Sequence, residues 1–204
     1  MLFVDTHKLD WTYLPVDFDG ALIYGVDTHA PSALSPSEEA GRQLDCVHCV
    51  EMMSGHNGCS LQEFTEEELT SSIGRVPETV RRYCLHIVCE NERVLHCRQA
   101  LSRGDLRWVG KLLNESHESL RDLYEGTSPE VDWLVKHSHE VHGVYGARLA
   151  GGSTGTCALI LASRDAEEHL RQMLREYERI FGFHPDVLTC RPDSGVAVES
   201  REGT

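Results

Sequence analysis

The period of the hydrophobic pattern changes at Gly143, and this change decides the fold class. From residue 36 to residue 142, apolar residues recur every three or four positions, as on the buried face of amphipathic helices. After Gly143 come two apolar strand-like runs around a glycine-rich loop, a helical segment at 165–181 and the strand-like segments DVLTC and GVAVES. This order predicts an α+β domain with helices packed on one face of a mostly antiparallel sheet.

Capping residues predict where the helices begin. Ser35 and Glu38 form a capping box for the first helix, whose apolar residues Leu44, Val47 and Val50 follow at helical spacing. Similar caps and glycine stops bound the later helices, and the short links indicate antiparallel neighbours. The predicted helices cover residues 36–53, 65–74, 77–104, 105–126 and 128–143.

Three short segments before the first helix read as strands. They are LFVDT at 2–6, DWTYLPV at 10–16 and GALIYGVDT at 20–28. Each alternates apolar with polar residues or runs apolar between Gly and Asp, as strands do. We expect them to form part of a sheet.

Charge excludes several classes of partner. Acidic residues outnumber basic ones by 33 to 19, which gives a formal net charge of −14. Such a field repels polyanions, so we expect neither a nucleic-acid partner nor a membrane partner. Charged residues interrupt the first segment, MLFVDTHKLDWTYLPV, and no apolar run approaches the roughly 20 residues of a membrane helix. Eight cysteines without a signal peptide predict reduced thiols and a cytoplasmic protein.

A cluster of cysteines and histidines raises the question of a metal site. Cys46, His48 and Cys49, with His56 and Cys59 downstream, could in principle hold zinc. Two of these cysteines lie within a predicted helix, where small buried thiols are common. We therefore expect no metal site.

Ser116, His117 and Asp122 offer the residue types of a hydrolytic triad. On one helix, adjacent side chains point about 100° apart, so the serine and the histidine cannot form the required hydrogen bond. Hydrolase chemistry is disfavoured.

The glycine-rich loop GGSTG at 151–155 allows two interpretations. Gly151, Gly152 and Gly155 permit positive φ and let backbone N–H groups converge on an anion. A tight packing turn is the alternative, because the loop has no Lys and precedes a strand, unlike a P-loop.

Longer motifs carry a family resemblance. Residues 110–135 read GKLLNESHESLRDLYEGTSPEVDWLV, preceded by HIVCENERV at 86–94 and followed by GVYGARLAGGSTGTC at 143–157. FVDTHKLDWTYLPV and SEEAGRQLDC match further upstream motifs. Together they resemble the C-terminal half of the galactokinases, in the GHMP kinase superfamily, over essentially the whole chain. The resemblance implies the ferredoxin-like α+β fold of a GHMP kinase C-terminal domain.

The resemblance also implies site residues. In the family, the glycine-rich loop lies at the active site between the sugar and the nucleotide phosphates, which places Gly151, Gly152, Ser153 and Gly155 near phosphate. Glu39 falls where the family has a sugar-contacting Tyr and is the candidate for substrate binding. ATP and Mg²⁺ are the implied cofactors.

The motifs of the family's first half do not occur in this sequence. The phosphate loop and the catalytic Asp are among them, so we expect no catalytic residue in this chain. Residues 1–30 are expected to continue a missing N-terminal kinase domain, and residues 31–204 to form the C-terminal domain.

The resemblance implies the C-terminal part of a sugar kinase that converts galactose to galactose 1-phosphate with ATP, inactive as this isolated chain. Galactose and ATP are expected partners once an N-terminal half complements it. The alternative is a non-catalytic sensor or interaction protein. It is suggested by departures from the family's residues at Glu39, at Leu123 and in the loop. Unpaired edges of the first strands also suggest a homodimer.

Overall fold

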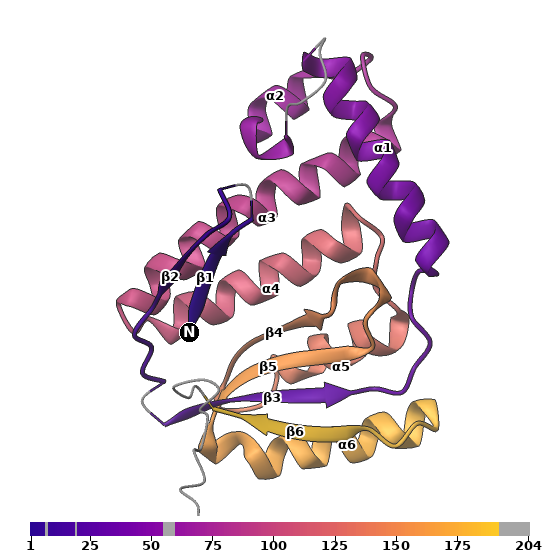
Figure 1. Cartoon of the computed structure of the whole chain (residues 1–204). Coiled ribbons are helices and arrows are strands. Elements are labelled where there is room, and N and C mark those ends of the chain that lie inside the picture. Colours follow the sequence, from indigo (N-terminus) through magenta and orange to yellow (C-terminus); the bar gives the residue numbers. More distant parts are fainter. Residues whose placement is uncertain (7, 19, 55–59, 192–204) are drawn as a thin grey trace, which may run out of the picture.

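The computed structural model describes residues 1–6, 8–18, 20–54 and 60–191 (Figure 1). The strand predicted within GVAVES lies outside these residues. In chain order the elements are β1 (Leu2–Asp5), β2 (Asp10–Tyr13), β3 (Ala21–Asp27), α1 (Pro36–Ser54), η1 (Leu61–Glu63), α2 (Glu66–Ser71), α3 (Glu78–Ser102), α4 (Leu106–Asp122), α5 (Pro129–Ser138), β4 (Val144–Ala150), η2 (Gly152–Thr154), β5 (Cys157–Ser163), η3 (Arg164–Ala166), α6 (Glu167–Phe181) and β6 (Asp186–Cys190).

A four-stranded antiparallel sheet organises the C-terminal part of the chain. Its strand order is β4-β5-β3-β6, with β3 paired to β5 on one side and to β6 on the other. The predicted α+β class with an antiparallel sheet is confirmed. Strand β3 falls within the predicted 1–30 segment, yet it lies inside the sheet of the predicted 31–204 segment.

The main core lies between this sheet and helices α5 and α6. Strand alternation turns Leu22, Tyr24 and Val26 of β3 toward these helices, where they join a buried cluster with Ile160 of β5. From α6, the residues Leu170, Met173, Leu174 and Tyr177 enter the same cluster at helical spacing. Burial of such side chains contributes about 25 cal/mol per Å² of apolar surface.

Helix α4 packs so closely on strand β4 that both contacting positions require glycine. A Cβ atom on Gly146 would lie 2.0 Å from the carbonyl oxygen of Gly110, and one on Gly110 would lie 2.1 Å from that of Tyr145. A second cluster joins the start of α4 and the end of α3 to Ala21 and Leu161. These two residues point to the opposite side of the strands from Leu22 and Ile160, so the end of α3 and the start of α4 cover part of the other face of the sheet, in addition to the helices on the predicted face.

The helix starts follow the predicted caps. Ser35 Oγ accepts from the Glu38 N–H, and Glu38 accepts from the Ser35 N–H over 2.8 Å. The buried side of α1 differs from the prediction: Cys46, Cys49 and Val50 are buried, whereas Leu44 and Val47 are 61% and 54% exposed. The reason is that α1 packs against α3 through one side only (Figure 1).

Two helices end earlier than expected. Helix α4 ends at Asp122 rather than near Gly126, and α5 ends at Ser138 rather than near Gly143. In each case the backbone turns to bring the next segment onto the sheet.

The first two strands form a separate hairpin instead of joining β3 in one sheet. Strands β1 and β2 pair antiparallel in a two-stranded sheet that lies across α3 (Figure 1). The α-amino group of Met1 donates to the Leu14 carbonyl over 2.9 Å and closes its open end. None of the helices in the described ranges is both long and apolar enough to cross a membrane.

Candidate functional site

The glycine-rich loop connects β4 to β5 and has the backbone shape that needs glycine. Gly151 and Gly152 have φ values of +79° and +67°, a region that L-residues rarely adopt. A Cβ atom on Gly155 would lie 2.0 Å from the Ala150 carbonyl oxygen. Between these glycines, Gly152–Thr154 makes one short turn of 3₁₀ helix. The loop is therefore a fixed, tightly folded turn that leaves little room on its inner side.

The structure brings together the residue predicted to bind the substrate and the loop predicted to lie near phosphate. Glu39 comes from the first turns of α1, and Ser153 comes from the loop. The Ser153 hydroxyl donates a hydrogen bond to Glu39 Oε2, and the Tyr124 hydroxyl donates to Glu39 Oε1 over 3.0 Å. Ser153 and Tyr124 are only 3% and 5% exposed. One carboxylate thus satisfies two buried hydroxyl groups from different elements.

The segment before α1 also binds the outer side of the loop. The Ser32 hydroxyl donates to the Thr154 carbonyl over 2.8 Å, and the Leu34 N–H donates to the Ser153 carbonyl over 3.4 Å. At the far end, the Thr28 hydroxyl donates to the Thr156 carbonyl over 2.7 Å. These contacts hold the loop to residues 28–39 along its length.

Tyr124 and Arg42 complete the surroundings of Glu39. The Arg42 guanidinium donates to the Tyr124 carbonyl and lies 4.7 Å from the Tyr83 ring centroid and 5.3 Å from that of Tyr124. Burial, together with the nearby Glu39 carboxylate, raises the pKa of the Tyr124 phenol. Tyr124 is therefore a neutral hydrogen-bond donor at physiological pH. Its contact with Glu39 was not anticipated, although both residues lie in the quoted motifs.

A second polar network, which sequence reasoning missed, lies between α3, α4 and β4. Glu90 accepts from the Ser116 hydroxyl over 2.6 Å, pairs with Arg148 at 3.2 Å and also pairs with Arg93. Burial opposes ionisation of Glu90, but the Ser116 hydrogen bond and the two arginines lower its pKa below the ordinary value. The signal in the sequence was the acidic residue of HIVCENERV, which lies four residues after His86 on the same helix.

The histidines of this region have structural partners. The Leu149 N–H donates to His117 Nδ1 over 3.3 Å, so the ring donates from Nε2 to Asp132 over 3.1 Å. His86 Nδ1 shares a 2.8 Å hydrogen bond with the Ser119 hydroxyl, and burial lowers the pKa of His86 to about 4. Because Ser116 and His117 bind different partners, they do not form the pair that a hydrolytic triad requires.

Cys46, His48 and Cys49 of the cysteine and histidine cluster lie on α1. Within the described residues, no group of three or more His, Cys, Asp or Glu side chains is placed to hold a metal ion. Cys46 and Cys49 are buried against α3 beside Cys84. Hydrogen bonds with these two thiols, together with burial, raise the pKa of Cys84. His56 and Cys59 lie outside the described residues.

The antiparallel sheet, the helices packed on it and the glycine-rich loop together point to one class of protein. The family model described as GHMP kinases C terminal matches residues 97–179, from the end of α3 to the end of α6. Over these residues the chain therefore matches the C-terminal domain of the GHMP kinases. A homoserine kinase from Cytophaga hutchinsonii, 13% identical with a TM-score of 0.54, shares the fold.

Within this class, the chain is similar to the C-terminal half of the galactokinases. The galactokinase of Thermotoga petrophila is 37% identical over 96% of this chain and 54% of its own length. The crystal structure of Lactococcus lactis galactokinase complexed with galactose matches with a TM-score of 0.85 and 30% identity, covering 92% of this chain and 49% of that protein. The chain thus spans about half the length of the relatives it matches, and the predicted resemblance is confirmed.

The backbone shape of the glycine-rich loop suits the phosphates of ATP, but the charge at the loop does not. The positive φ values at Gly151 and Gly152 permit close approach of an anion. However, the Glu39 carboxylate is hydrogen-bonded to Ser153 at the centre of the loop. Among the described residues, no hydrogen bond or ion pair joins a Lys or Arg to Gly151–Gly155. The loop of this chain alone does not provide the positive charge that polyphosphate and Mg²⁺ chemistry requires.

Proposed function

We propose that this chain provides the C-terminal half of a galactokinase-type sugar kinase, whose reaction transfers phosphate from ATP to galactose to give galactose 1-phosphate. The observation that carries the proposal is the match to Lactococcus lactis galactokinase, with a TM-score of 0.85 over half of that protein. Glu39 would then face the sugar, and Gly151, Gly152, Ser153 and Gly155 would lie near the transferred phosphate. Galactose, ATP and Mg²⁺ are the proposed ligands of the complemented enzyme.

We propose further that the isolated chain is inactive. Phosphoryl transfer depends on positioning ATP and neutralising its charge. The phosphate loop and the catalytic Asp of the family have no counterpart in this sequence. In this proposal the part of residues 1–30 that precedes β3 continues the N-terminal kinase domain, and β3 joins residues 31–204 in the C-terminal domain. The protein works in the cytoplasm. Free thiols at every described cysteine are compatible with a reducing compartment.

Complementation tests this proposal. The purified chain would be mixed with the N-terminal half of the Thermotoga petrophila galactokinase, and galactose 1-phosphate formation would be measured with ATP and Mg²⁺. We expect no turnover by either part alone and turnover in the mixture. Gly155→Ala should abolish the restored activity, because its Cβ would collide with the Ala150 carbonyl, whereas Gly41→Ala in α1 has open space and should not. A folded complex without turnover would contradict the proposal.

A second candidate function is a non-catalytic galactose or nucleotide sensor. The observation that favours it is that both carboxylate oxygens of Glu39 already accept hydrogen bonds within the chain, from Ser153 and from Tyr124. Calorimetric titration of the isolated chain with galactose, and separately with ATP and Mg²⁺, tests this reading. Binding of one ligand without turnover would support it, and turnover by the chain alone would eliminate it.

A further inference from the structure

Three buried cysteines lie together where α1 packs on α3. Cys46 and Cys49 come from α1 and Cys84 comes from α3, and these residues are 5%, 0% and 0% exposed, respectively. All three belong to one apolar cluster with Val50 and Leu69, and all three are free thiols. The function proposed above uses none of them, so their chemistry stands apart from the site at the glycine-rich loop.

Hydrogen bonds join the thiols across the contact between the two helices. Cys84 shares hydrogen bonds with Cys46 and with Cys49, and these bonds raise the pKa of Cys84. The hydrogen bond with Cys84 lowers the pKa of Cys49, although burial acts against it. The Cys49 Sγ also lies 3.9 Å from the Met53 Sδ. Because the thiolate is the reactive form of cysteine, Cys49 is the nucleophile of the Cys49 and Cys84 pair.

Helix geometry decides which two thiols can join. Cys46 and Cys49 are three residues apart on α1, where the Cβ atoms of such a pair lie about 5–6 Å apart. A disulfide bond needs Cβ atoms about 3.5–4.5 Å apart, so α1 would have to distort to join these two. Cys84 approaches from the neighbouring helix, and side chains of packed helices interdigitate. A bond between α1 and α3 therefore requires less distortion than a bond within α1.

From this arrangement we propose that oxidation by a small peroxide joins Cys49 to Cys84 in a disulfide bond between α1 and α3. The Cys49 thiolate attacks one oxygen of hydrogen peroxide, the O–O bond breaks, and the departing hydroxide takes up a proton to become water. Cys84 then attacks the Cys49 sulfur, so that the S–S bond forms and the S–O bond breaks. The second oxygen leaves as water with the proton of Cys84. Two thiols are oxidised, and one peroxide is reduced to two water molecules.

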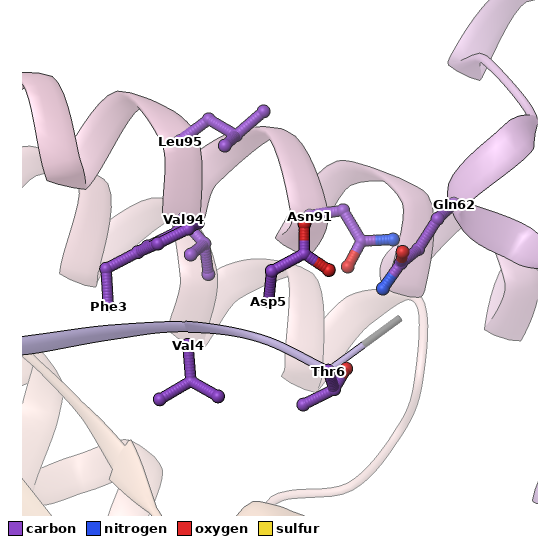
Figure 2. Close-up of a pocket in the computed structure, with 8 residues that line it drawn as sticks. All are labelled: Phe3, Val4, Asp5, Thr6, Gln62, Asn91, Val94 and Leu95. Atoms are coloured by element: carbon purple, nitrogen blue, oxygen red, sulfur yellow. The ribbon is translucent and has the colours of Figure 1, made fainter. Parts of the chain in front are cut away.

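Oxidation requires a local opening of α1, because Cys49 and Cys84 are both 0% exposed. The cavity between the hairpin and α3 does not provide access. It has a volume of about 320 Å³ and is lined by residues such as Phe3, Asn91 and Val94, and by none of the described cysteines (Figure 2). Helix α1 packs on α3 through one side only, so movement of α1 away from α3 exposes the thiols. We expect slow oxidation of the native chain and faster oxidation in urea below the unfolding transition.

The bond would change how firmly α1 is held. A link between residues 49 and 84 closes a loop in the unfolded chain, which stabilises the folded state. The same helix carries Glu39, whose carboxylate accepts the hydrogen bond of Ser153. The oxidation state of the thiols would therefore set how tightly α1, and Glu39 with it, is fixed to α3. The inference rests on contacts buried within the chain and does not depend on the proposed kinase function.

Peptide mapping of the purified chain tests the proposal. The chain would be treated with hydrogen peroxide, its remaining thiols would be blocked in denaturant, and trypsin would cleave it without reductant. Trypsin places Cys49 and Cys84 on separate peptides, 43–75 and 83–93. We expect a linked pair that is lighter by two hydrogen atoms than the two free peptides, with fragmentation locating the bond at Cys49 and Cys84. The unfolding temperature should rise by about 5–10 °C, and dithiothreitol should reverse both changes.

Cys46→Ala is the matched control, because Cys46 is a buried thiol one turn earlier on the same side of α1. This variant should still form the bond, whereas Cys49→Ala should give no peptide linked to 83–93 and no rise in unfolding temperature. If Cys49→Ala does not fold, the map of the unchanged chain decides, since fragmentation assigns the bond directly. A bond from Cys84 to Cys46, oxidation of Cys49 to the sulfinic acid without a link, or no linked peptides at all would overturn the proposal.

Discussion

At the scale of single residues, Glu39 determines the character of the glycine loop. One carboxylate accepts hydrogen bonds from a loop serine and from a tyrosine, and both donor residues are buried. Glu39 was singled out from the family resemblance, which also implied that the glycine loop lies at the same site. The actual partners were beyond the sequence, because the Ser153 and Tyr124 hydroxyls reach Glu39 only after three separate segments have packed.

Glu39→Ala is expected to destabilise the fold by about 2–4 kcal/mol. It leaves two buried hydroxyl groups without their acceptor, and each such loss costs about 1–3 kcal/mol. Urea unfolding measures the change, with Glu51→Ala, an exposed glutamate on the same helix, as the control. Glu39→Gln keeps one acceptor oxygen and should cost less. An unchanged free energy of unfolding in Glu39→Ala would show that the Ser153 and Tyr124 hydrogen bonds do not stabilise the loop.

At the scale of elements, the caps were the most reliable sequence signals because they act locally. Ser128 and Asp105 cap their helices as the spacing indicated. The buried side of α1 and the separation of β3 from the hairpin could not be predicted, since both depend on neighbours distant in sequence. Leu44 and Val47 have the spacing of a core stripe, yet α3 packs against the side that carries Cys46 and Cys49.

Gly146→Ala tests the contact between α4 and β4. The added methyl group would collide with the Gly110 carbonyl at 2.0 Å, and backbone on both sides limits relaxation. We expect a loss of about 1–3 kcal/mol or more in the free energy of unfolding, as for overpacked cores. The control, Gly41→Ala in an open position of α1, should instead stabilise by about 0.5–1 kcal/mol. Equal effects in the two variants would refute the close contact.

At the scale of the whole molecule, buried ionisable groups make stability depend on pH. His86 is 8% exposed and packs near Tyr124 and Ser119, where burial lowers its pKa to about 4. In the unfolded chain, the ordinary pKa near 6.5 applies. Between these two values, the unfolded state therefore binds more protons than the folded state.

Stability is accordingly expected to fall as the pH decreases from about 6.5 to about 4, with His86 contributing on the order of 3 kcal/mol at the lower limit. Urea unfolding at a series of pH values measures this slope. His86→Gln retains a hydrogen-bonding side chain and should flatten the profile in that range. A His86→Gln profile parallel to that of the unchanged chain would contradict the assignment to His86.

The central place of β3 has a consequence for the order in which the protein acquires its structure. This strand is synthesised before its partners β5 and β6, which follow more than a hundred residues later in the chain. During translation β3 must wait with both edges exposed, and such long-range pairing is slow and prone to aggregation. Cells that make this chain would therefore benefit from chaperones that shield the nascent N-terminal segment until the ribosome has released β6.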